Sequence, residues 1–191
     1  MNSFSELVKK SRSIRRFDET RPVARETLET FVDLVRYSPS AANRQPLKFF
    51  LSNSPDLNAE IFPCLGWAAY LSEWKGPAEG ERPAAYIVIL GDRNISENVT
   101  WDHSIASQTI MLAAAEKNMG GCIIGAIDRK GLHKALNFDE QYEILLVLAL
   151  GYPAEDVVIE PLGDDGDIKY WRDEKGVHHV PKRALRDIIV N

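Results

Sequence analysis

Three arginines and two serines occur within seven residues near the N-terminus, in the sequence S-R-S-I-R-R-F. Arg12 and Arg15 are three positions apart, with Ser13 between them. Guanidinium and hydroxyl groups supply positive charge and several directed hydrogen-bond donors, which suit a phosphate monoester. A second basic pair, Lys182-Arg183, occurs near the other end of the sequence and could close on the same anion. The alternative interpretation is a solvent-exposed basic turn.

A polar loop with small residues, S-A-A-N-R-Q, follows Pro39 and ends at Pro46. Ser40, Asn43 and Gln45 carry its donors and acceptors. Because amide side chains offer both kinds of group, they suit the edge of a heteroaromatic ring. The alternative is a plain connection between two elements.

Aromatic side chains are concentrated in the segment from about residue 62 to residue 82. Trp67, Tyr70 and Trp74 are spaced at i, i+3 and i+7, which predicts that they share one face of a helix. Prolines and glycines surround them. The segment is therefore interpreted either as a lid lobe over a pocket or against a partner subunit, or equally as plain core.

The length and the amino-acid composition are those of an ordinary globular protein. We expect a single domain over residues 1–191 with a polar C-terminal tail at 162–191. The net charge of −5 argues against nucleic-acid binding. There is no apolar run long enough to span a membrane and no signal-peptide core, and the two cysteines have no metal-ligand spacing. We therefore expect a cytoplasmic protein without a metal site and without membrane or nucleic-acid partners.

Alternating helical and extended patterns predict the elements that position these residues. Two apolar runs, at 84–90 and 142–150, are typical of strands that are buried on both faces. The segment 101–118 is apolar almost all round, so this helix must pack on several sides or across a subunit interface. The remaining predicted elements are a short helix before residue 11, helices at 23–37 and 128–136 and from Ser54-Pro55 onward, and strands at 48–52 and after residue 120.

Three local features carry further expectations. Gly120 and Gly121 are predicted to cap the long helix, and Gly125 fits a place where the backbone lies close to a flat group. Adjacent histidines on a strand, such as those at 178–179, point to opposite faces and are poor co-ligands for one metal ion. The apolar helical spacing at 184–190 predicts that the C-terminal tail docks either on the body of the chain or on the partner subunit.

Taken in order, several of these motifs resemble the nitroreductase family of flavin enzymes. They are R-S-I-R-R-F, S-P-S-A-A-N-R-Q-P, M-G-G-C-I-I-G after the alanine-rich helix, G-Y-P after the last strong strand, and a terminal P-K-R. The resemblance extends over nearly the whole chain, from Arg12 to Arg183. Two features depart from it: Leu47 stands where the family often has an aromatic residue, and no polar pair matches the one that binds the flavin pyrimidine edge in some members.

The resemblance implies an α+β fold with a central antiparallel or mixed sheet flanked by helices. It also implies a homodimer with one FMN in each of two clefts at the subunit interface, where the helix at 101–118 is the main contact. The implied cofactor residues are Arg12, Ser13, Arg15, Lys182 and Arg183 for the phosphate and ribityl chain, Pro39, Ser40, Asn43 and Gln45 from the partner subunit, and the backbone of Ile124 and Gly125 near the flavin N5 edge.

The implied reaction is the transfer of hydride from NADH or NADPH to the flavin and then to an electron-poor aromatic compound or quinone. We expect no catalytic side chain, and Trp67, Tyr70 and Trp74 are candidates for stacking on the substrate. The alternatives are a dehalogenase or a flavin-degrading enzyme, a flavin-binding or redox-sensing protein without turnover, and a structural dimer without a cofactor.

Overall fold

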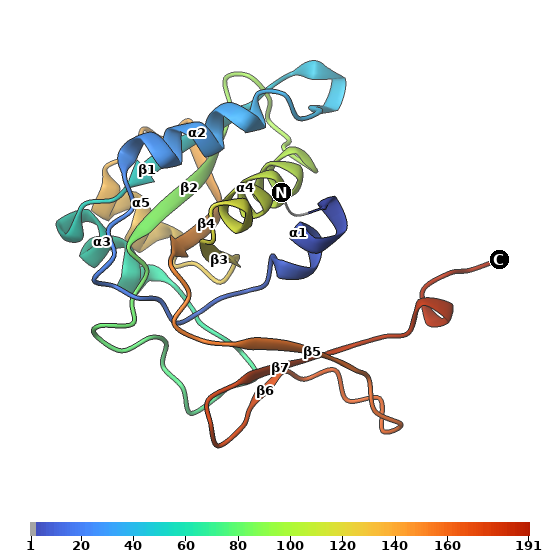
Figure 1. The fold of residues 1–191 in the computed structure, drawn as a ribbon. Coiled ribbons are helices and arrows are strands. Elements are labelled where there is room, and N and C mark those ends of the chain that lie inside the picture. Colours follow the sequence, from blue (N-terminus) through green and yellow to red (C-terminus); the bar gives the residue numbers. More distant parts are fainter. Residues whose placement is uncertain (1–2) are drawn as a thin grey trace.

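A four-stranded antiparallel sheet forms the centre of the molecule, in the order β1-β2-β4-β3 (Figure 1). The computed structural model describes residues 3–191, so Met1 and Asn2 of the expected domain lie outside the described residues. The strands are β1 (Leu47–Ser52), β2 (Ala85–Asp92), β3 (Gly120–Ile124) and β4 (Tyr142–Gly151). The predicted strands at 48–52, 84–90, 142–150 and after residue 120 are thus confirmed to within two residues.

Helices cover both faces of this sheet, so the fold is α+β as expected (Figure 1). The helices α2 (Arg25–Val35) and α4 (Asp102–Glu116) share one hydrophobic cluster with one face. The helices α3 (Pro55–Ile61) and α5 (Arg129–Leu136) contribute to the cluster on the other face. The short helix α1 (Phe4–Lys10) precedes the arginine-rich segment and begins with a capping box between Ser3 and Glu6.

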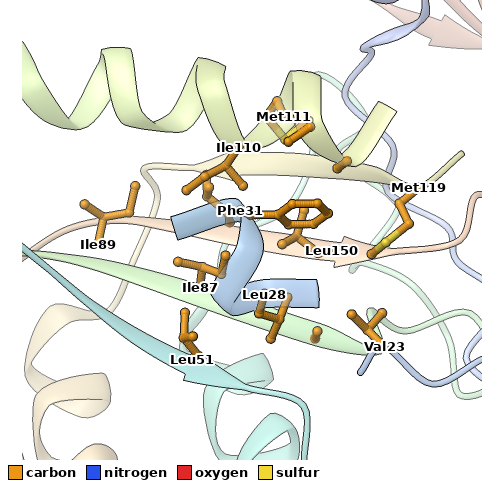
Figure 2. Packing of buried hydrophobic residues seen from close by; sticks show 14 of the residues in the cluster. Val23, Leu28, Phe31, Leu51, Ile87, Ile89, Ile110, Met111, Met119 and Leu150 are labelled. Atoms are coloured by element: carbon orange, nitrogen blue, oxygen red, sulfur yellow. The ribbon is translucent and has the colours of Figure 1, made fainter. Parts of the chain in front are cut away.

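Alternation along the central strands explains why they are apolar without interruption. Ile87 and Ile89 of β2 pack against α2 and α4, whereas Val88 and Leu90 belong to the cluster on the opposite face. Figure 2 shows the first of these clusters, with Phe31 of α2 between the long helix and the sheet. Because successive side chains of a strand point to opposite faces, the prediction of burial on both faces is confirmed for all of β2. In β4 it is confirmed from Val147 onward, whereas the first half of that strand is partly exposed.

The end of α4 differs from the prediction that glycines cap it. Asn118 takes the left-handed conformation there, with φ of 57°, which asparagine tolerates better than most residues. Gly120 and Gly121 instead begin β3. An added Cβ at Gly120 would lie 2.5 Å from Cγ1 of Ile14. This glycine is therefore needed for close packing against the arginine-rich segment and not for a helix cap.

The predicted helix through the aromatic segment is wrong. Residues 66–80 form turns and irregular structure. Ala68 has a φ of 36° and Gly76 a φ of 116°, and neither value continues a right-handed helix. Trp67 packs against Trp74 with 6.5 Å between ring centroids, so the two tryptophans contact each other directly. We call residues 66–80 the aromatic lobe.

A second, three-stranded sheet lies beside the main body, in the order β5-β7-β6 (Figure 1). Its strands are β5 (Val157–Pro161), β6 (Trp171–Arg172) and β7 (His178–Lys182). β5 and β7 are parallel, and β6 is antiparallel to β7. This sheet brings the C-terminal part of the chain next to the N-terminal arginine-rich segment.

The terminal segment 184–190 does not dock on the body of its own chain. It forms only a 3-10 turn, Leu185–Asp187, and projects away from the body (Figure 1). Ile188 and Val190 are largely exposed. None of the helices in residues 3–191 is both long and apolar enough to cross a membrane, and the same range contains no group of three or more His, Cys, Asp or Glu side chains that could hold a metal ion.

Candidate functional site

A cavity of about 370 Å³ lies between the arginine-rich segment, α4, the end of β3 and the second sheet. It has a basic side, formed by two arginines and a lysine, and an apolar side. Gln108 and Met111 come from α4 and Ile123 comes from β3. The other lining residues are Ser11, Arg12, Ser13, Arg15, Val157, Tyr170, His178, Val180 and Lys182.

The arginine-rich segment is held in an extended conformation along β3. Ser13 forms a parallel bridge with Gly121, and the N–H of Ile14 donates to the carbonyl of Gly121 at 2.8 Å. Ile14 and Phe17 are buried in the core. Because alternate residues of an extended segment point in opposite directions, burying Ile14 turns Ser13 and Arg15 toward the cavity.

A buried carboxylate fixes the other side of this segment. Oε1 of Glu155 accepts hydrogen bonds from the backbone N–H groups of Arg15 at 2.5 Å and Arg16 at 3.1 Å. Its Oε2 pairs with the guanidinium of Arg172 at 2.8 Å. The side chain of Glu155 is only 1% exposed. Each oxygen thus has a charged or backbone donor, which a buried carboxylate requires.

Arg12 and Arg15 are held in different ways. A terminal nitrogen of Arg12 donates to the carbonyl of Val8, while its Nε is buried without a hydrogen-bond partner in the described chain. Burial lowers the pKa of Arg12 from its usual value. The guanidinium of Arg15 lies over the ring of Tyr170, 4.8 Å from the centroid, and one nitrogen lies 3.3 Å from His178 Nε2.

His178 is almost completely buried beside these cations. The pKa of His178 is lowered from 6.5 to about 4, chiefly because the ring is buried. The positive charges of Arg15, Arg172 and His179 also lower it, and the negative charge of Glu155 raises it. The imidazole is therefore neutral at physiological pH and can accept a hydrogen bond from Arg15.

Four of the five residues predicted for the phosphate line this cavity: Arg12, Ser13, Arg15 and Lys182. His178, Val180 and Lys182 alternate along β7 and so share the face that lines the cavity. Arg183 follows the end of the strand, is exposed and is not part of the lining. The structure thus brings the two remote basic clusters together through Lys182.

The polar loop lies at a different place on this chain. Pro39, Ser40 and Gln45 line a second cavity of about 260 Å³ at the N-terminal end of α4. The hydroxyl of Ser40 donates to the buried carboxylate of Asp102, and Gln45 donates to the side-chain oxygen of Asn43 at 3.2 Å. Asn43 is exposed and does not line either cavity.

This loop has an unusual backbone. Ala42, Asn43 and Gln45 have φ values of 51°, 54° and 53°, a region that residues other than glycine rarely adopt. Such conformations cost free energy and are found most often where a loop has a binding or catalytic role. The backbone therefore supports a functional role for this loop, although its side chains make contacts within it.

The two residues predicted for the flavin N5 edge lie at the end of β3. Ile124 is buried on the α3 and α5 face of the sheet, and its neighbour Ile123 lines the cavity instead. Gly125 is exposed, and an added Cβ there would meet only Cδ2 of Leu146, at 3.7 Å. The backbone at this position is therefore open to a ligand.

The aromatic lobe contacts the cavity through the second sheet. The ring of Tyr70 packs against Tyr170 with 5.0 Å between centroids, and the N–H of Tyr70 donates to the Tyr170 hydroxyl at 3.4 Å. Arg172 lies over the ring of Trp74, 4.3 Å from its centroid. Tyr70 thus contacts a residue of the lining directly. Trp67 and Trp74 contact each other, and their other partners, Phe62 and Arg172, do not line this cavity.

Sequence reasoning missed several important residues of this site. Nothing in the local sequence around Glu155, Tyr170 and His178 indicates a contact with Arg15. The pairs Tyr170-Trp171 and His178-His179 were visible only as features of a polar tail. Their roles depend on the second sheet, and the hydrophobic periodicity of the sequence does not indicate how its strands pair.

Three comparisons with known proteins agree with this architecture. A model described as "Nitroreductase family" matches residues 8–152. The protein named "Putative NAD(P)H nitroreductase YodC" of Bacillus subtilis is 25% identical over 181 residues, covering 79% of this chain and 90% of that protein. The nitroreductase family protein of Streptococcus pneumoniae TIGR4 is similar in structure, with a TM-score of 0.72, 16% identity, and coverage of 99% of this chain and 100% of that one.

A further solved structure, an FMN-dependent nitroreductase of Clostridium difficile R20291, has a TM-score of 0.64 and 22% identity, and the match covers 78% of this chain and 87% of that one. These two structures share the fold. The family model covers well over half of the sequence. This chain therefore belongs to the nitroreductase family.

Proposed function

We propose that the protein is an FMN-dependent oxidoreductase that uses NADH or NADPH to reduce nitroaromatic compounds, quinones or similar electron-poor small molecules. Family membership supports the reaction class. Names of similar proteins support the donor and the cofactor, since one is described as an NAD(P)H nitroreductase and another as FMN-dependent.

The observation that carries the proposal is the convergence of Arg12, Arg15 and Lys182 on one cavity. They come from segments near opposite ends of an acidic chain, so their proximity is not a consequence of composition. Guanidinium and ammonium groups together bind the two negative charges of a phosphate monoester well. The unpartnered, buried Nε of Arg12 leaves a donor available to such a ligand after a small shift.

The residues present fit FMN at its phosphate end. Arg12, Arg15 and Lys182 would hold the phosphate, and the hydroxyl of Ser13 would contact the ribityl chain. Met111 and Ile123 give the cavity an apolar side, and the open backbone at Gly125 would lie near the ring. FMN supplies hydride acceptance and donation when it is bound, while the chain binds and orients it.

A second subunit would complete the ring site. The loop that contains Pro39, Ser40, Asn43 and Gln45 lies at the start of α4, whereas Gln108 and Met111 of the same helix line the cavity. Asp102 beside the loop and Gln108 in the cavity are six residues apart, about 9 Å along the helix, and the two cavities share no lining residue. Packing of α4 against a second copy would let each loop reach the partner's cavity.

An exposed apolar side chain on α4 supports this homodimer and provides its test. Ile105 is 37% exposed on the helix. Ile105→Glu should shift the protein toward monomer in sedimentation velocity, because a charge would be buried in the interface. Ile95→Glu is the matched control, since Ile95 is similarly exposed but lies in a loop outside α4. If both variants shift the protein toward monomer equally, or if neither does, α4 is not the interface.

The aromatic lobe would contribute to substrate binding. Tyr70 is the best placed of the three predicted residues, because it packs on Tyr170, which lines the cavity. Trp67 and Trp74 would act by holding the lobe in place, since each packs against the other. The flat rings of nitroaromatic compounds and quinones suit a site with aromatic walls.

The visible absorption spectrum of the purified protein tests the proposal, followed by release and identification of the chromophore. The expected result is FMN close to one per chain that NADH or NADPH bleaches and that a nitroaromatic compound or quinone reoxidises. A bound flavin that neither nucleotide bleaches would indicate a flavin-binding or sensing protein. Reoxidation only by halogenated aromatic compounds, or loss of the flavin itself, would indicate the dehalogenase or flavin-degrading alternative. A colourless protein that does not take up FMN would contradict the proposal.

A further inference from the structure

Arg15 is the most constrained of the three cations around the cavity. Its guanidinium carbon lies over the ring of Tyr170, 4.8 Å from the ring centroid, and one terminal nitrogen lies 3.3 Å from Nε2 of His178. Tyr170 and His178 also contact each other, with 5.2 Å between ring centroids. All three side chains line the cavity. The guanidinium is therefore in contact with two other side chains of the lining, one aromatic and one that offers an acceptor.

The contact with Arg15 defines the state of His178. Arginine has only donors, so Nε2 must be the acceptor and the ring proton must be on Nδ1. Nδ1 is buried and has no hydrogen-bond partner among residues 3–191. Burial and the charge of Arg15 keep the imidazole neutral by lowering its pKa to about 4. The Nδ1–H of His178 is therefore a buried donor without a partner in the described residues, while its Nε2 is fixed as an acceptor that faces Arg15.

The other two cations lack such support. Arg12 has one hydrogen bond from its guanidinium, to the carbonyl of Val8, and Lys182 is exposed at the end of β7. A long flexible side chain loses conformational entropy when it binds a ligand, and a side chain that is already fixed loses less. Arg15 is therefore the cation that is preorganised for a ligand, and its support comes from two residues that are remote from it in the sequence.

We infer that Tyr170 and His178 are positioning residues that hold the Arg15 guanidinium for the phosphate group of a ligand in the cavity. The inference rests on the proposed function, in which this ligand is FMN. Tyr170 acts through its ring face and His178 through the Nε2 lone pair. Because Tyr170 also packs on Tyr70, the same residue anchors the aromatic lobe beside the phosphate site.

The test compares FMN with riboflavin, which has the same ring and ribityl chain but no phosphate. Dissociation constants are measured by flavin fluorescence titration of the full-length protein after dialysis to remove bound flavin. Tyr170→Leu and His178→Leu should each weaken FMN binding about tenfold and leave riboflavin binding within about twofold, because a charge-assisted phosphate contact is lost and no ring contact is.

Conservative variants distinguish positioning from a general structural role. Tyr170→Phe keeps the aromatic face, and His178→Gln keeps an acceptor, so each should restore FMN affinity to within about threefold of wild type. Trp171→Leu is the matched control. Trp171 is the neighbour of Tyr170 and stacks on His179 instead of lining the cavity, so neither dissociation constant should change.

The outcomes separate this inference from the proposed function. Equal weakening of FMN and riboflavin in the leucine variants, or failure of the conservative variants to restore FMN binding, would overturn the positioning roles. Leucine variants that retain the wild-type preference for FMN would overturn them as well. A wild-type protein that binds neither flavin would contradict the proposed function itself, and the inference with it.

Discussion

The backbone N–H of Arg15 donates to Oε1 of Glu155 at 2.5 Å, across 140 positions of sequence. The same carboxylate group accepts from Arg16 and pairs with Arg172. One buried side chain therefore joins the arginine-rich segment to the last residue of β6. This link sets the distance between Arg15 and the residues that support its guanidinium.

Glu155→Ala should lower the free energy of unfolding by about 3–5 kcal/mol, because it leaves Arg172 as an uncompensated charge in a largely buried position. The side chain of Arg172 is 11% exposed. Urea unfolding monitored by circular dichroism measures the effect. Glu143→Ala is the control, since its pair with Arg93 is exposed and should contribute less than about 1 kcal/mol. A loss at Glu155 no larger than at Glu143 would contradict this role.

Lys182→Ala should weaken FMN binding about tenfold or more, because a charged contact to phosphate is worth about 1.5–3 kcal/mol. Riboflavin binding should be unchanged, since Lys182 lies at the basic side of the cavity. Arg183→Ala is the matched control: it removes an adjacent positive charge that does not line the cavity. Fluorescence titration with both flavins measures these effects. A larger effect at Arg183 than at Lys182 would mean that the partner subunit or the terminal segment changes this arrangement.

Most of the fold could be predicted from the sequence, because periodicity reports burial directly. The continuous apolar runs at 84–90 and 142–150 and the apolar helix at 101–118 correspond to β2, β4 and α4. The aromatic lobe could not be predicted from spacing alone. Trp67, Tyr70 and Trp74 have helical spacing, but the backbone at Ala68 and Gly76 is left-handed. Trp67 and Trp74 instead pack on each other, with 6.5 Å between their ring centroids.

The candidate site was predictable only where its residues form local clusters. Arg12, Ser13 and Arg15 are close in sequence and form a recognisable donor set. Tyr170 and His178 reach Arg15 because β7 pairs in parallel with β5 on one side and antiparallel with β6 on the other. This long-range pairing has no local signature in the sequence. Glu155 gives no local signal for the same reason, since two adjacent acidic residues in a loop after a strand do not indicate their partners.

The pH dependence of stability should report on His178. Its pKa is about 4 in the folded protein and 6.5 in the unfolded chain, so between these values the unfolded state binds more protons. The free energy of unfolding should therefore fall as the pH is lowered from about 6.5 toward 4, and His178 should have no such effect at higher pH. The charged groups near it are Arg15, Arg172 and His179, which oppose protonation, and Glu155, which favours it.

Urea unfolding of wild type and His178→Gln at several pH values measures this dependence. Glutamine cannot be protonated, so the variant should lose less stability than wild type over the same interval. Parallel curves for the two proteins would show that His178 is not the group responsible. Acid effects from Asp173, whose pKa is lowered by hydrogen bonds from neighbouring residues, belong to lower pH and are common to both proteins.

Gly120 and Gly125 are near the two ends of the short strand β3 and should respond differently to alanine. An added Cβ at Gly120 would lie 2.5 Å from Cγ1 of Ile14, so Gly120→Ala should cost about 1–3 kcal/mol of stability. At Gly125 the nearest atom is Cδ2 of Leu146, 3.7 Å away, and Gly125→Ala should change stability by less than about 0.5 kcal/mol.

Gly125→Ala should nevertheless weaken FMN and riboflavin binding to the same degree, because the backbone at Gly125 is expected near the ring that both flavins share. This pattern differs from that of Lys182→Ala, which should affect only the flavin that carries a phosphate. Thermal unfolding without ligand and titration with both flavins measure the two properties separately. Wild-type affinity of Gly125→Ala for both flavins would remove Gly125 from the ring site and would place the ring farther from the end of β3.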